Sequence, residues 1–82
     1  MVELRYFAWL RERVGVGHEQ VETEAATVGE LINELKDRDE AYAFAFSDLS
    51  AIRAAVDQEL VEFDAPLAGA REIAFFPPMT GG

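Results

Sequence analysis

The sequence contains no cysteine, and its single histidine is His18. The lack of thiols excludes a disulfide scaffold, a cysteine nucleophile and thiolate metal sites. A Ser-His-Asp set and a glycine-rich phosphate-binding loop are missing as well. We therefore expect no bound metal, and any sulfur chemistry of this chain must use a group other than a side-chain thiol.

Long apolar runs and an excess of basic charge are also missing. No apolar segment approaches the ~20 residues of a membrane-spanning helix. The first residues show no basic region followed by an apolar stretch, so we expect no signal peptide. With 16 acidic and 7 basic residues the formal net charge is −9, whereas nucleic acids and anionic membranes attract basic surfaces. We expect a cytoplasmic protein that binds neither. The acidity either favours a partner with a basic surface or only maintains solubility.

The length of 82 residues suits one small domain. The pattern predicts strands, helical segments and one ambiguous stretch in the order ββαβββ. Thr27 and Glu30 have the spacing of a capping box, followed by apolar residues at helical spacing. The alternation in residues 41–46 fits a strand, while their alanine content fits a short helix. The expected strands are 2–7, 18–22, 51–56, 60–63 and 72–76, with a helical turn at 9–14 and the main helix after Thr27.

The C-terminal segment is the most informative part of the chain. Residues 73–76 are apolar and aromatic, and Pro77 and Pro78 cannot donate backbone hydrogen bonds to a sheet interior. The last residues, Met79 to Gly82, finish in two glycines, so the tip of the chain has no side-chain bulk. We therefore divide the chain into a domain at 1–76 and an extended tail at 77–82. The only unusual chemical group that such a tail offers is its own α-carboxylate.

Several strings in the sequence resemble one known family. Residues 75–82, Phe-Phe-Pro-Pro-Met-Thr-Gly-Gly, are similar to the C-terminal motif of the MoaD-type sulfur carriers, the small subunits of molybdopterin synthase. Residues 54–67 resemble the central segment of that family, and residues 6–15 resemble its opening. Position 57 departs from the pattern, because Asp57 stands where the family has asparagine. The similarity covers most of the chain and is weakest at 17–50.

The resemblance implies an α+β fold, the ubiquitin-like β-grasp, in which the first and last strands are parallel neighbours and one main helix packs on one face of a mixed sheet. Two sets of residues would then face opposite sides of the sheet. The expected core set is Val2, Leu4, Tyr6, Ile73 and Phe75. The opposite set is Phe7, Ala74 and Phe76, with Arg5 nearby, and an exposed aromatic pair beside the tail is typical of a docking patch.

The resemblance also implies the chemistry of the tail. An E1-like adenylyltransferase would use ATP and Mg²⁺ to adenylate Gly82, and a sulfurtransferase would supply the sulfur for a thiocarboxylate. The large synthase subunit would receive this tail and pass the sulfur to cyclic pyranopterin monophosphate, in a heterotetramer. This chain would bind no cofactor and act as a non-catalytic carrier subunit. The partner-binding residues would be Phe7, Phe76, Pro77, Pro78, Met79, Thr80 and Gly81.

Other interpretations remain open at this point. The chain could be a β-grasp carrier for thiamine synthesis or tRNA thiolation, a modifier that forms isopeptide bonds, or a binding module whose terminus performs no chemistry. Asp37, Asp39 and Glu40 could suggest a site for a hard cation, but a solvated helix end explains them better, because they lack the spacing of a calcium loop. Asp57 and Asp64 are expected in turns.

Overall fold

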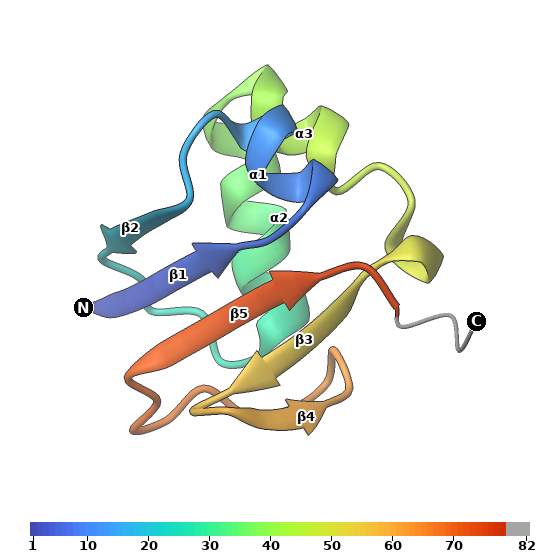
Figure 1. Cartoon of the computed structure of the whole chain (residues 1–82). Helices are drawn as coiled ribbons and strands as arrows, with labels where there is room; N and C mark the ends of the chain where they lie inside the picture. Colours follow the sequence, from blue (N-terminus) through green and yellow to red (C-terminus); the bar gives the residue numbers. More distant parts are fainter. Residues whose placement is uncertain (79–82) are drawn as a thin grey trace.

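A five-stranded sheet with helix α2 across one face forms the body of the protein (Figure 1). The computed structural model describes residues 1–78. The strands are β1 (Val2–Tyr6), β2 (His18–Val21), β3 (Arg53–Val56), β4 (Glu59–Val61) and β5 (Glu72–Phe76). The helices are α1 (Trp9–Val14), α2 (Val28–Arg38) and α3 (Glu40–Ala45), with a 3₁₀ turn, η1, at Leu49–Ala51.

The strand order is β2-β1-β5-β3-β4, which places the first and last strands of the chain side by side at the centre. The β1–β5 pair is parallel and the other three pairs are antiparallel. This arrangement confirms the expected ubiquitin-like β-grasp. Because β1 and β5 run in the same direction, both strands end at the same edge of the molecule.

The alternation predicted for β1 and β5 is confirmed. Each of the five predicted core residues is buried, with at most 6% of its surface exposed. They form one cluster with the apolar stripe of α2, which repeats at helical spacing. The α2 members of this core are Val28, Leu31, Ile32 and Leu35.

Helix α2 begins at the predicted capping box. The Thr27 hydroxyl oxygen accepts a hydrogen bond from the Glu30 N–H at 3.2 Å. The Glu30 carboxylate reaches back to the Ala26 N–H at 3.4 Å, one residue earlier than the standard box. The helix start is therefore fixed by local side-chain contacts that the sequence already contains.

The ambiguous stretch at 41–46 lies almost entirely in helix α3. The Asp39 carboxylate accepts a hydrogen bond from the Ala41 N–H at 2.8 Å and so caps this helix. A strand would place Phe44 and Phe46 on the same face. In the structure Phe44 is 58% exposed, whereas Phe46 is fully buried. Asp39 thus has a structural role, as expected for a helix end.

The predicted strand boundaries differ most from the structure at β3 and β4, while β1 and β2 each end one residue earlier than expected. β3 begins at Arg53 rather than at residue 51, because the preceding residues form the turn η1, which the Asp48 side chain caps through the Ser50 N–H. β4 ends at Val61 rather than at residue 63. The carbonyl of Phe63 instead accepts a hydrogen bond from the Gly29 N–H at 2.7 Å, which attaches this segment to the first turn of α2.

The β3–β4 hairpin turns at Asp57 and Gln58, which both have positive φ angles, 49° and 72°. This is the pattern of a type I′ turn, which matches the twist of a hairpin. Aspartate tolerates the left-handed region, and one oxygen of Asp57 also accepts hydrogen bonds from the N–H groups of Arg71 and Glu72, both at 3.0 Å. Asp57 therefore joins the hairpin turn to the start of β5.

We expect Asp57→Ala to lower the free energy of unfolding by about 1–3 kcal/mol, since it leaves two backbone donors without their acceptor. Asp57→Asn is the matched control, because its amide oxygen can still accept and asparagine also tolerates positive φ. Urea unfolding of the three proteins measures the difference. An alanine variant as stable as the asparagine variant would show that these two hydrogen bonds contribute little.

The carboxylate of Glu19 lies at the aromatic end of the core and binds two tyrosine hydroxyls. The hydroxyls of Tyr6 and Tyr42 both donate to the same oxygen of Glu19, at 2.8 and 2.6 Å. Burial, reinforced by this carboxylate, raises the pKa of Tyr6 far above its ordinary value. Burial and the same hydrogen-bond acceptor raise the pKa of Tyr42 to about 12. Both phenols are therefore held in their protonated form in the native state.

These raised pKa values predict a loss of stability in alkali. A phenol that binds its proton more tightly in the folded chain gives full stabilisation below its unfolded pKa of about 10, and this is lost as the pH rises above that value. For Tyr42 the loss extends to about pH 12. Thermal unfolding measured across this range should show a falling midpoint. Tyr42→Phe should be less stable at neutral pH but show a shallower decline, and an equal decline in both proteins would contradict the assignment.

Candidate functional site

The face of the sheet opposite α2 has none of the described helices packed on it (Figure 1). The strand register places one row of residues across this face: Leu60 beside Ala55, Ala55 beside Ala74, Ala74 beside Arg5, and Arg5 beside His18. We call this surface the open face. It also carries Glu3 and Glu72 at the beginning of the central strands, and Arg53 with Phe76 at the end of β5.

Phe7 and Phe76 are brought together on the open face. Phe7 follows β1, and its N–H donates to the Phe75 carbonyl at 3.1 Å, so it continues the pairing with β5. Its side chain is 47% exposed, while Phe76 is half-buried. Pro77 and Pro78, which continue the chain from this edge, are half-buried. The predicted face of both aromatic residues is confirmed, and their binding role stays a prediction.

The remaining predicted site residues, Met79, Thr80, Gly81 and Gly82, lie outside the residues that the structure describes. The described part establishes the position from which they continue. That position is the end of β5, where Phe76 lies beside Arg53. The Arg53 guanidinium donates to the Ile52 carbonyl at 3.1 Å, which leaves the side chain partly occupied with its own backbone.

Leu60 is a candidate site residue that the sequence analysis missed. Its side chain is 68% exposed, an unusual position for a leucine in a strand. The signal was available, because a two-residue turn at Asp57-Gln58 fixes Leu60 opposite Ala55, and Ala54 takes the core side. By strand register, Ala55 and Ala74 lie between Leu60 and Phe76 on the open face. We name the apolar residues Phe7, Leu60 and Phe76 the docking patch.

Charged side chains occupy the other half of the open face. The Arg5 guanidinium lies 3.2 Å from a carboxylate oxygen of Glu3 and 2.5 Å from one of Glu72. The imidazole Nδ1 of His18 lies 3.8 Å from Glu3, and His18 is the exposed first residue of β2. Arg5 is therefore neutralised within the protein. Apart from Arg53, which lies beside Phe76, the open face divides into an internally paired charged half and the apolar docking patch.

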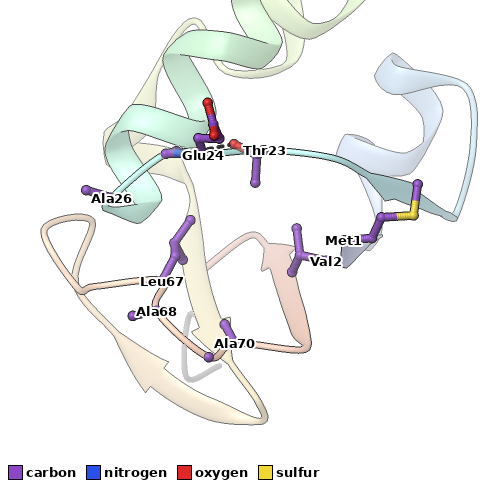
Figure 2. Close-up of a pocket in the computed structure, with 10 residues that line it drawn as sticks. Met1, Val2, Thr23, Glu24, Ala26, Leu67, Ala68 and Ala70 are labelled. Carbon is purple, nitrogen blue, oxygen red and sulfur yellow. Dashed lines mark hydrogen bonds between the residues drawn. The ribbon is translucent and has the colours of Figure 1, made fainter.

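One hollow of the described surface is unrelated to this site. A pocket of about 380 Å³ lies between the start of β1, residues 23–26 and residues 67–70, as Figure 2 shows. It is at the opposite end of the central strands from Phe76. The Thr23 hydroxyl in its wall already donates to Glu34 and accepts from the Ala25 N–H. This polar group is therefore used to hold the loop.

The described residues contain neither a metal-binding cluster nor a membrane-spanning helix. Within residues 1–78, no group of three or more His, Asp or Glu side chains is placed to hold a metal ion. In the same residues, no helix is long and apolar enough to cross a membrane. An exposed apolar patch framed by charged residues is suited to binding another protein.

Comparison with known proteins gives consistent matches over the whole chain. The model of the ThiS family matches residues 4–82. The molybdopterin synthase sulfur carrier subunit of Escherichia coli (strain K12) is 40% identical over the full length of both chains. The subunit of the same name from Haemophilus influenzae is 33% identical, also over both full lengths.

A solved structure confirms the architecture. The crystal structure of SAMP1 from Haloferax volcanii superimposes with a TM-score of 0.73 at 26% identity, covering 99% of this chain and 98% of that one. The sequence match and the fold thus agree from the first strand to the last. This chain belongs to the ThiS family.

Proposed function

We propose that this protein is the sulfur-carrier subunit of a molybdopterin synthase and that Gly82 is the residue that carries the sulfur. The observation that supports this most is the full-length match to two proteins named as that subunit, which extends to the last residue. The absence of cysteine fits the proposal, because the sulfur is then held by the terminal carboxyl carbon and not by a thiol.

The chemistry follows from the state of an α-carboxylate. With a reference pKa of about 3.3–3.7, it is ionised at neutral pH and does not react with nucleophiles. An E1-like adenylyltransferase converts it with ATP and Mg²⁺ to an acyl-adenylate, which is electrophilic. The sulfur of a sulfide or persulfide donor attacks the carbonyl carbon and AMP leaves. Sulfide gives the thiocarboxylate of Gly82 directly, whereas a persulfide first gives an acyl disulfide, which a thiol reductant cleaves to the thiocarboxylate while the donor leaves in a disulfide with that thiol.

The large synthase subunit then uses this group as a sulfur nucleophile. The thiocarboxylate adds its sulfur to cyclic pyranopterin monophosphate, and hydrolysis returns the carboxylate of Gly82. Two such transfers give the dithiolene that binds molybdenum. The acid and base groups for these steps belong to the partner proteins, so this chain acts as a tethered substrate of each enzyme and not as the catalyst.

The residue types of the proposed tail, 77–82, suit delivery into a narrow site. An extended segment of this length spans about 20 Å at roughly 3.3–3.6 Å per residue. Pro77 and Pro78 restrict its base, which reduces the entropy lost on insertion. Gly81 and Gly82 bring no side chains that would obstruct a channel. The domain at 1–76 then provides the surface that a partner binds.

We assign this partner binding to the docking patch. Phe7, Leu60 and Phe76 lie on the same face as the start of the tail, so a partner that covers them also receives the terminus. Aromatic and leucine side chains exposed in this way gain most from burial at an interface. The large synthase subunit is the proposed occupant of this patch, within the heterotetramer that the family resemblance implies.

The first test is the intact mass of the untagged chain after incubation with ATP, Mg²⁺, the cognate adenylyltransferase and a sulfur donor. We expect one oxygen to be replaced by sulfur, located on the peptide that ends in Gly82. A chain with one alanine added after Gly82 is the control and should stay unmodified. If the unextended chain stays unmodified as well, the sulfur-carrier proposal fails, and a binding module without terminal chemistry becomes the better hypothesis for the function.

The second test addresses the docking patch. Phe7→Ala and Leu60→Ala should each weaken binding to the purified large subunit by about tenfold or more, as expected for central apolar residues of an interface. Both side chains are exposed, so thermal stability should change little. Asn33→Ala, on the exposed side of α2, is the control for the other face of the sheet. Equal affinities of all three variants and the wild type would remove the patch from the interface.

A further inference from the structure

The guanidinium of Arg13 lies over two aromatic rings at the surface of the protein. Its guanidinium carbon lies 4.6 Å from the centre of the Trp9 ring and 4.2 Å from the centre of the Phe44 ring. Trp9 and Arg13 belong to α1, and Phe44 belongs to α3. Stacking on two rings restricts a side chain that otherwise has many rotamers. We call these three residues the arginine clamp.

The clamp leaves the hydrogen-bonding edge of the guanidinium unused. Arg13 is exposed, and within residues 1–78 no carboxylate forms an ion pair with it, although the chain has 16 acidic residues. Arg5, by contrast, is paired with two carboxylates. Both rings contact the guanidinium through its central carbon, and no described acceptor takes its N–H groups. A carboxylate binds the free edge of a guanidinium through two parallel hydrogen bonds.

The clamp also lies at the end of the molecule that the proposed function uses. α1 starts at Trp9, two residues after Phe7, and packs against both β1 and α3. Figure 1 shows α1 beyond the tip of β1, at the edge to which β5 also points. Phe44 is 58% exposed and Phe7 is 47% exposed. Tryptophan and arginine are the residue types most often found to dominate binding energy at interfaces.

We propose that the arginine clamp is a second contact for the protein that docks on the open face, and that Arg13 binds an aspartate or glutamate side chain of that partner. This inference rests on the proposed function for the identity of the partner. Charge complementarity at this point supports a carboxylate, because Arg13 is an exposed cation that no described carboxylate of its own chain pairs. The clamp fixes Arg13 before the partner arrives, which lowers the entropy cost of forming the contact.

The test is calorimetric titration of the large synthase subunit with the full chain at several salt concentrations. Arg13→Gln should weaken binding by about tenfold and reduce the dependence of the affinity on salt. Arg71→Gln is the matched control, because it removes the same charge just before β5, at the opposite end of the central strands. We expect its affinity to stay within about twofold of the wild type. If the two variants behave alike, the clamp only packs α1 against α3.

A second measurement needs no variant and therefore does not depend on correct folding of one. In the ¹⁵N-labelled wild-type chain, the Nε–H signal of Arg13 should shift when the large subunit is added, while that of Arg71 should not. An unshifted Arg13 signal in the formed complex overturns the inference and leaves the proposed function intact. If the wild-type chain does not bind the large subunit at all, the inference and the proposed docking both fail.

Discussion

The parallel pairing of β1 with β5 is the constraint on which the rest of the structure depends. It places the two ends of the chain side by side at the centre of the sheet and makes both strands finish at the same edge. On the buried side this pairing stacks Tyr6 on Phe75, with ring centres 6.1 Å apart. On the open side it brings Phe7 to the edge where Phe76 leads into the tail. The site therefore exists only because the first strand and the last strand pair.

A domain of this size has little core to stabilise that pairing, so its aromatic cluster matters more than in a larger protein. Phe46 packs edge-on against Phe75, with ring centres 5.0 Å apart, and also contacts the ring of Tyr6. A tyrosine in this position brings a hydroxyl that needs a partner once it is buried. Glu19 supplies the acceptor from β2, the edge strand beside β1. One carboxylate thereby allows the end of β1 to be both buried and polar.

Local patterns predicted the strands β1 and β5 and the helix α2, because alternation and capping are properties of neighbouring residues. The faces of Phe7 and Phe76 followed only when the fold implied by the family resemblance was added to the alternation. Local patterns could not decide between a helix and a strand for residues 41–46, because the outcome depended on which aromatic side chain the core could accept. They also missed Glu19, whose two partners are Tyr6 and Tyr42, far away in the sequence. Leu60 lies between these cases, since its face follows from the turn at 57–58 once that turn is read as a two-residue hairpin.

Under the proposed function, the division of the open face into two halves has a physical reason. A sulfur carrier must bind an activating enzyme, leave it, and then bind the large subunit, so no single interface can be very stable. Three apolar side chains bury too little surface for a permanent complex. The paired charges of Arg5 with Glu3 and Glu72 add little affinity, because they are already satisfied in the free chain. Discrimination between successive partners must then come from groups outside the patch, and Arg13 is a cation that the described fold holds in place without pairing it.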